Sequence, residues 1–468
     1  YLKKVIFLLL DGARFDILDE LLGSNSLPNL SSIIKSGSYT KAVSVFPSTT
    51  GPAYVPFLMG QYPGNVNLPG IRWLDKVNFS KNPFSTNANR SYVGYENKFF
   101  NDDIKKSFKT IFNYLPNSVS IFNEITSGLN ARNDLTSNSK IFYKLLSHFF
   151  GSSLIDKIAF KKLINSFDNK KQFYFCCLYG IDSLSHIQGS DTESIKQLYK
   201  SFDNNLGKLR NFLEDKSTYE DTLIIITSDH GHSNTSEHFD LVEYLKSKNK
   251  SIFYYPLTFK KLYKKFDSSV MVSGNSMAHI YLNSNFNWSK PFSFSQHEEL
   301  INDLISQDAV DIISYKNPKG DIIILSSRGK SLISDKESSI YYQPLENDPF
   351  DYSISEGLYD ENQLLDLTYE TNYPDAIIQL LQIFRSKRCG DLVLSANPGW
   401  DFRKKFELPL HKSSHGSLRK EHMIVPLILN KKINNIPKIR TVDIYNTMLE
   451  FLGIKSLNAI EGKKLDIY

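Results

Sequence analysis

Seven side chains in this sequence are of types that bind metal ions or attack phosphorus. Asp182 and His186 are four residues apart, so they share one face if their segment is helical. Asp229 and His230 are adjacent and directly follow an apolar run. The other three are Asp11, Thr50 and His415. Carboxylates and imidazoles are zinc ligands, and a hydroxyl held by zinc ionises near neutral pH.

The six nitrogen and oxygen ligands divide into two sites. One set is Asp182, His186 and His415, and the other is Asp11, Asp229 and His230. Their mixed character suits zinc better than magnesium or calcium. Two such cations about 4 Å apart can clamp the attacking and leaving oxygens of a phosphoryl transfer. Thr50 is placed to supply the attacking hydroxyl. The pattern therefore predicts a two-zinc centre for phosphoryl transfer.

Each of these residues also has a purely structural interpretation. An aspartate after a buried strand, such as Asp11, is more often a helix N-cap than a ligand. Asp182 and His186 fit a cap and a surface imidazole. The segment from Asp229 to His232 is harder to explain, because three ionisable groups after a buried strand are costly to bury unpaired. We favour the metal interpretation because the structural one would have to hold at every position together.

Three continuous apolar runs lead to these ligands and predict the fold. They are KKVIFLLLDG (3–12), KQFYFCCLYG (171–180) and DTLIIITSDH (221–230). Runs of this kind are typical of parallel strands buried on both faces. Because the carboxyl ends of such strands share one edge, the side chains that follow them should meet there. The sequence therefore predicts an α/β fold with a mostly parallel central sheet flanked by helices.

The rest of the chain predicts a single catalytic domain, 1–468, that carries insertions. Residues 73–169 are irregular and polar, with helical pieces at 120–129 and 141–150, and are expected to cover an edge of the sheet. Residues 270–374 predict a small α+β unit that ends in a long polar connection from 335 onward. An amphipathic helix over TVDIYNTMLEFLGI (441–454) should close the domain.

The composition limits the classes of function. The chain has 468 residues, of which 41% are hydrophobic, enough for a large core. Its net charge of +5 is scattered, which suits an anionic small substrate and argues against a nucleic-acid patch. We see neither an apolar stretch of about 18 residues nor a signal peptide. Cys176, Cys177 and Cys389 are expected to be core thiols and not a disulfide framework.

Several ordered motifs give the sequence a resemblance to a known family. They are VIFLLLDGAR, LPNLSSIIKSG, FPSTTGPAYVPFLMGQYP, GIDSLSH, ITSDHGHS, SHGSLRKEHMIVPLIL and TVDIYNTMLEFLGI followed by EGKKL. Together they span the chain and resemble the alkaline phosphatase superfamily, and within it the nucleotide pyrophosphatase/phosphodiesterase branch. The resemblance implies one zinc at Asp182, His186 and His415. It implies a second zinc at Asp11, Asp229 and His230, bridged by Thr50.

The resemblance also implies the chemistry. Thr50 would attack phosphorus and form a covalent phosphothreonine that water then hydrolyses. The register of the family motif selects Thr50 over Thr49 and Ser48, and threonine at this place is similar to the diesterase members. The resemblance favours an extracytoplasmic or secreted protein.

One departure from the family concerns substrate binding. The family usually has an asparagine shortly after the glycine-X-tyrosine-proline element, where its amide holds a phosphate oxygen. Here the segment reads NVNLPGIRWLDK (65–76), without an asparagine in that register. We expect Arg72 or Lys76 to take this role, or Asn67 through a shifted loop. Trp73, with Trp400 and Tyr62, could stack a nucleobase, although core packing is commoner for such residues.

Four further histidines lie close in sequence to the ligands. They are His232, His238, His411 and His422. We expect them to be supporting hydrogen-bond partners or loop residues, and not direct ligands.

The sequence thus predicts a two-zinc phosphodiesterase or nucleotide pyrophosphatase that acts on an anionic phosphate ester, such as a nucleotide or a lipid headgroup. Two alternatives are enzymes of the same fold, a headgroup transferase and a phosphomonoesterase. A third alternative is a binding protein that has lost catalysis.

Overall fold

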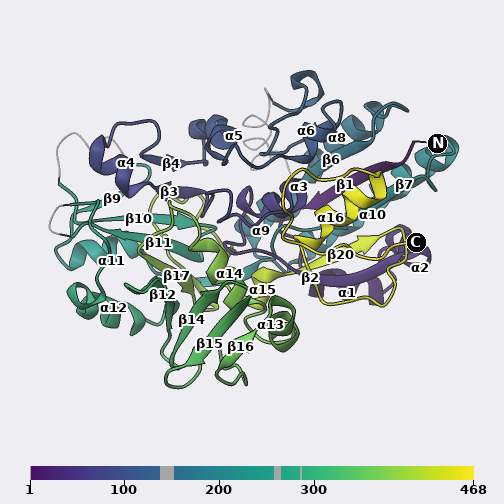
Figure 1. Cartoon of the computed structure of the whole chain (residues 1–468). Helices are drawn as coiled ribbons and strands as arrows, with labels where there is room; N and C mark the ends of the chain where they lie inside the picture. Colours follow the sequence, from purple (N-terminus) through teal and green to yellow (C-terminus); the bar gives the residue numbers. More distant parts are fainter. Residues whose placement is uncertain (1, 138–151, 258–264, 285–286) are drawn as a thin grey trace.

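A computed structural model describes residues 2–137, 152–257, 265–284 and 287–468, and the helix predicted at 141–150 lies outside these ranges. Two β-sheets lie beside each other with helices packed around them (Figure 1). Both chain ends lie near the first sheet, on the right in Figure 1.

The first sheet carries the strands predicted from the apolar runs. Within the described residues its strand order is β21-β2-β20-β7-β1-β6-β5. The bounds are β1 Lys4–Leu10, β2 Ser38–Val43, β5 Val119–Ile121, β6 Phe173–Leu178, β7 Thr222–Thr227, β20 Ile424–Leu429 and β21 Ile439–Arg440. β1 runs parallel to both β6 and β7, with Leu9 opposite Cys177 and Thr227. This register brings the carboxyl ends of the three strands to one edge, which confirms the predicted α/β fold.

Helices bury the first sheet. Every residue of β1, β6 and β7 is buried, as their continuous apolar sequence requires. α10 packs against α1, α2, α8 and α9, while α16 packs against α3 and β1. The bounds are α1 Phe15–Gly23, α2 Pro28–Ser36, α3 Val55–Met59, α6 Ile111–Tyr114, α8 Ser152–Asn165, α9 Gly180–Gln188, α10 Glu193–Asp215 and α16 Asp443–Leu452.

The second sheet is larger than the small unit predicted for 270–374. Its order within the described residues is β16-β15-β14-β13-β12-β17-β11-β10-β9. The bounds are β9 Ile252–Tyr254, β10 Ser268–Ser273, β11 Met277–Leu282, β12 Val310–Lys316, β13 Ile322–Leu325, β14 Lys330–Lys336, β15 Ser339–Pro344, β16 Gly357–Tyr359 and β17 Leu392–Ala396. β9 and β17 lie outside the predicted range. β17 pairs with β11 and β12, and its apolar sequence alone does not reveal which sheet it joins.

The stretch predicted as a long connection, 335–374, is structured. It contains β15, β16 and a helix, and Tyr342, Phe350 and Tyr373 are buried in a shared core. The helices that accompany this sheet are α11 Leu241–Ser247, α12 Glu298–Ile305, α13 Glu361–Thr368, α14 Ala376–Ile383 and α15 Lys420–Met423, with the 3-10 turn η5 Phe294–Gln296.

The region predicted to cover a sheet edge, 73–169, divides between the two sheets. β5 forms the edge of the first sheet, while Leu74 and Phe79 pack with Phe253 and Tyr281 of the second. The predicted helix at 120–129 is wrong, because β5 ends there in a loop in which the Asn123 side chain bonds the backbone of Ile125. The remaining bounds are β3 Arg72–Leu74, α4 Lys76–Lys81, β4 Asn89–Ser91, η2 Tyr95–Phe99, α5 Phe100–Asp103 and η3 Ala131–Asn133.

Three short strands complete the structure beside the first sheet's ligand edge. They are β8 Ser233–His238, β18 Gly399–Asp401 and β19 Ser413–Ser414. β8 pairs with both of the others, so the chain that follows β7 is bound to the chain that precedes His415. No helix in the described part of the chain has the length and apolar character needed to span a membrane.

Candidate functional site

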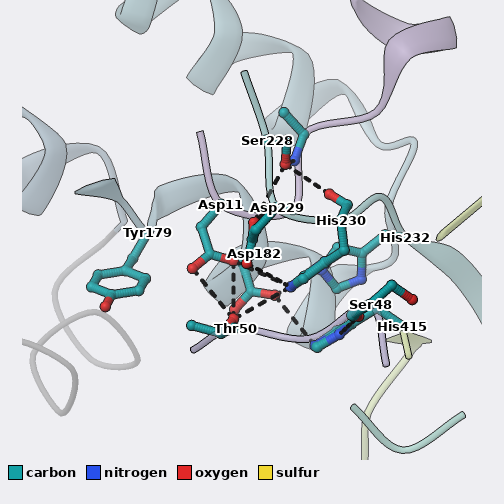
Figure 2. Close-up of polar contacts among 12 residues, drawn as sticks. Asp11, Ser48, Thr50, Tyr179, Asp182, Ser228, Asp229, His230, His232 and His415 are labelled. Carbon is teal, nitrogen blue, oxygen red and sulfur yellow. Dashed lines mark hydrogen bonds and ion pairs between the residues drawn. The ribbon is translucent and has the colours of Figure 1, made fainter. Parts of the chain in front are cut away.

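All seven residues that the sequence singles out lie together at the carboxyl edge of β1, β6 and β7. Figure 2 labels all of them except His186. Asp11 follows β1 and Asp229 follows β7, while Asp182 and His186 lie on α9, directly after β6. The backbone N–H of Asp182 donates to the Asp11 carbonyl over 3.1 Å, which ties the two strand ends together.

One group of possible metal ligands contains Asp182, His186, His232 and His415. Their ligand atoms all lie within 4.8 Å of one another. Asp182 Oδ1 is 3.3 Å from His186 Nε2, 3.8 Å from His415 Nε2 and 2.8 Å from His232 Nε2. Asp182 and His186 share one helix face, as their spacing of four residues predicts, because α9 spans Gly180–Gln188.

A second group contains Asp11, Asp229 and His230, whose ligand atoms meet the same 4.8 Å limit. His230 Nε2 is 3.4 Å from Asp11 Oδ1 and 3.4 Å from Asp229 Oδ2. Asp229 Oδ2 is fully buried and has no hydrogen-bond partner among the described residues. A buried carboxylate oxygen without a donor is costly, so the donor set fits a bound cation.

The two groups adjoin each other. The rings of His230 and His415 stack at a centroid distance of 3.7 Å and an interplanar angle of 5°. Gly12 leaves room beside them for the ring of His232: its φ is +73°, and a Cβ there would lie 2.7 Å from that ring. A side chain at position 12 would therefore displace the imidazole.

Backbone carbonyls orient three of the imidazoles. Nδ1 of His186 is 2.9 Å from the Ser413 carbonyl, that of His415 is 2.9 Å from the Ser48 carbonyl, and that of His230 is 3.0 Å from the carbonyl of Gly231. A carbonyl oxygen can only accept, so each Nδ1 carries the proton and each Nε2 presents a lone pair to the cluster. This is the tautomer that a metal-binding histidine needs.

Burial and the Asp182 carboxylate together set the charge state of the cluster. Burial opposes protonation of His186, but Asp182 raises the pKa of this ring above its usual value. Burial lowers the pKa of His415 well below its usual value and that of His232 to about 3, so both rings are neutral at pH 7. Burial also raises the pKa of Asp229. Burial opposes the ionisation of Asp182 too, but His186 and His232 hold its pKa well below the usual range. Neutral imidazoles beside carboxylates are the forms that bind a divalent cation.

Thr50 lies against the second group. Its Oγ1 is 3.2 Å and 3.4 Å from the two carboxylate oxygens of Asp11 and 3.3 Å from His230 Nε2. Thr50 is half-buried, whereas Ser48 is fully buried and donates its hydroxyl to the Ser417 carbonyl over 3.0 Å. Of these two hydroxyls, that of Thr50 faces the ligand groups.

A cavity of about 420 Å³ opens beside the cluster, and its walls include Thr50, His186, His415 and Arg72. The other predicted substrate contacts lie elsewhere and do not line it. Lys76 Nζ pairs with Asp391 at 2.7 Å, and Asn67 Oδ1 accepts from Ser386 Oγ at 2.8 Å. Trp73 is fully buried, with its ring 3.8 Å from the Arg388 guanidinium. Tyr62 and Trp400 do not line the cavity either.

His232, predicted as a supporting hydrogen-bond partner, lies among the ligand atoms of the first group. Its place two residues after His230 in the motif DHGH was the available signal. The other extra histidines lie outside both groups: His238 pairs with Asp401, His422 bonds Ser233 and Ser417, and His411 lines the cavity.

Known proteins share the family and the fold of this chain. The family model of type I phosphodiesterase / nucleotide pyrophosphatase matches residues 5–418. The sequence has no significant match among curated proteins. Murine ectonucleotide pyrophosphatase / phosphodiesterase 5 has a similar fold, with a TM-score of 0.60, 15% identity, and coverage of 97% of this chain and 96% of its own.

A second structure with a similar fold is phosphonoacetate hydrolase from Sinorhizobium meliloti 1021 in complex with phosphonoformate, with a TM-score of 0.57, 15% identity and 96% coverage of both chains. At these identities the likeness concerns the fold, whereas the family match spans most of the sequence. The chain is a phosphoester hydrolase that belongs to the type I phosphodiesterase / nucleotide pyrophosphatase family.

Proposed function

We propose that this protein is a two-zinc phosphodiesterase or nucleotide pyrophosphatase that works through a covalent phosphothreonine at Thr50. The observation that carries the proposal is the position of Thr50 Oγ1, 3.2 Å from Asp11 Oδ1 and 3.3 Å from His230 Nε2, beside two groups of converging metal-ligand atoms.

The donor sets fit two metal ions. Asp182, His186 and His415 would hold one, and Asp11, Asp229, His230 and Thr50 the other. Nitrogen donors in both sets favour zinc over magnesium or calcium. When bound, the cations would supply charge neutralisation for the phosphate and lower the pKa of the nucleophilic hydroxyl.

The protein's own groups account for the remaining steps. The Thr50 hydroxyl loses its proton toward Asp11, whose carboxylate is within hydrogen-bond distance. Thr50 Oγ1 then forms a bond to phosphorus as the bond to the leaving oxygen breaks. Water later attacks the phosphothreonine and restores the hydroxyl. Tyr54 donates to Asp11 Oδ2 over 3.0 Å, which keeps that carboxylate in place.

Three solved structures support this choice of chemistry and ligand. An inactive threonine-to-alanine variant of murine ectonucleotide pyrophosphatase / phosphodiesterase 5 is in complex with AMP. The phosphonoacetate hydrolase structures hold phosphonoformate and phosphonoacetate. We infer that the substrate here is an anionic phosphate ester or anhydride of a small molecule, of the nucleotide class.

The test is hydrolysis of an aryl phosphodiester by the purified protein. Thr50→Ala should lower kcat by about a thousandfold or more, because the covalent route is removed. Thr49→Ala is the matched control and should keep most of the activity. Equal losses of rate in the two variants would contradict the mechanism. So would a Thr50→Ala variant that keeps the wild-type rate together with a wild-type enzyme that keeps its rate after chelation. Adding an acceptor alcohol and identifying the products distinguishes hydrolysis from headgroup transfer.

A further inference from the structure

Arg72 forms part of the wall of the catalytic cavity and is almost completely buried, with 7% of its surface exposed. It begins β3, whose partner strand β4 supplies Ser91. Arg72 Nε donates to Ser91 Oγ over 3.2 Å, and Nη1 donates to the Val272 carbonyl over 2.8 Å. These two bonds fix the plane of the guanidinium between β4 and β10.

The charge of Arg72 has no carboxylate partner among the described residues. Other buried arginines do have one: Arg90 pairs with Asp103 at 2.6 Å, and Arg440 pairs with Asp375 at 2.7 Å. Glu407 lines the same cavity, but it already pairs with Arg403 at 3.0 Å and His411 at 3.2 Å. Burial, with a contribution from Arg403, lowers the pKa of Arg72 to about 9, although the Glu407 charge offsets part of this effect. A buried cation with neutral partners is costly unless an anion joins it.

Arg72 is connected to the metal-ligand cluster through one short segment. Val272 accepts from Arg72, and two residues later the Gly274 carbonyl accepts from the backbone N–H of His415 over 3.0 Å. Two residues of extended chain span about 7 Å. Thr50 and Arg72 both line the cavity, and its volume of about 420 Å³ leaves room for a substrate that carries more than the reacting phosphate.

We propose that Arg72 binds a second anionic group of the substrate, a phosphate or a carboxylate, while the reacting phosphate lies at Thr50. A planar guanidinium held by Ser91 and Val272 keeps Nη2 for a charge-assisted bond to such a group. The inference rests on the proposed function and narrows its substrate class to esters or anhydrides that carry a further negative charge beyond the scissile phosphate.

Three aryl diesters with the same leaving group test this inference. The first is para-nitrophenyl propyl phosphate, and the other two carry a terminal carboxylate or a terminal phosphate on the propyl group. For the wild-type enzyme we expect kcat/KM to be about tenfold or more higher for at least one charged ester, as one charge-assisted hydrogen bond implies. The better of the two charged esters identifies the anion as carboxylate or phosphate.

The variant Arg72→Gln should abolish this preference, so that its kcat/KM values for the three esters become about equal. Arg388→Gln is the matched control, because Arg388 is a half-buried arginine beside Trp73 that does not line the cavity. Its preference should match that of the wild type. Thermal unfolding of both variants checks that they fold.

Two outcomes would overturn the inference. One is a wild-type enzyme without any preference for the charged esters, a measurement that needs no variant. The other is an Arg72→Gln enzyme that loses the same factor on all three esters, which would assign Arg72 to the reacting phosphate. Failure of the proposed function looks different, because Thr50→Ala would then hydrolyse all three esters at the wild-type rate.

Discussion

His232 is in a position to fix the Asp182 carboxylate. Its Nε2 lies 2.8 Å from Asp182 Oδ1, and its Nδ1 lies 3.1 Å from Ser413 Oγ. The ring is fully buried and is tightly packed against Gly12. A histidine that is hydrogen-bonded on both nitrogens holds a ligating carboxylate in one orientation, so its effect should be seen first in metal affinity.

We therefore predict that His232→Phe weakens metal binding by about tenfold to a hundredfold. His232→Gln, whose amide can donate to Asp182, should recover part of the affinity. Competition with a chromophoric chelator measures the affinity without reference to turnover. His238→Gln is the control, because His238 pairs with Asp401 outside both ligand groups. Wild-type affinity in His232→Phe would rule out this role.

At the scale of elements, α9 is the helix on which the site depends, because it carries both Asp182 and His186. Its first backbone N–H, that of Gly180, donates to Asp156 Oδ1 of α8 over 3.1 Å. Burial raises the pKa of Asp156 from 3.8 to about 7, and this hydrogen bond only partly offsets the rise. The contact that begins α9 is thus sensitive to pH.

An acid whose pKa is raised by folding stabilises the native state most at low pH, and this contribution is lost as the pH rises through about 7. Asp156→Asn keeps the oxygen that accepts from Gly180 but cannot ionise. We predict that the free energy of unfolding of the variant, relative to wild type, is higher at about pH 8 than at about pH 5. Urea unfolding at the two pH values measures this difference, and an equal difference at both would contradict it.

At the scale of the whole molecule, the site joins the two sheets. Asp11 and Asp229 follow strands of the first sheet, whereas the turn between β10 and β11 of the second sheet holds His415 through the Gly274 carbonyl. Ser276 and Ser414 add a hydroxyl contact of 2.7 Å in the same place. A cation shared by Asp182, His186 and His415 would therefore stabilise both sheets at once.

We predict that chelation lowers the thermal midpoint of unfolding by a few degrees while the transition stays single. When the free metal concentration is a hundred times its dissociation constant, binding stabilises the native state by about 2.7 kcal/mol. Calorimetry with chelator, and again after zinc is restored, gives the measurement. A transition that splits, with only one part responding to metal, would show that the sheets unfold independently.

Much of this protein can be predicted from its sequence. The continuous apolar runs of β1, β6 and β7 predict a parallel sheet, and the carboxyl ends of parallel strands lie at one edge. Asp11, Asp182 and Asp229 were therefore predictable as neighbours. The ordered motifs indicated the family, which the family match confirms. The roles of the individual ligands and of Thr50 stay predictions that the variants above test.

Only the tertiary structure decided the features that depend on contacts between distant segments. The apolar sequence of β17 is typical of a buried strand of either sheet. Its pairing with β11 and β12 places it in the second sheet. Arg72, Lys76 and Asn67 were equal candidates until packing placed Arg72 alone of the three in the cavity wall. His232 turned inward because Gly12 leaves room for its ring. Local sequence patterns set strands and their ends, whereas long-range packing sets which side chains face the substrate.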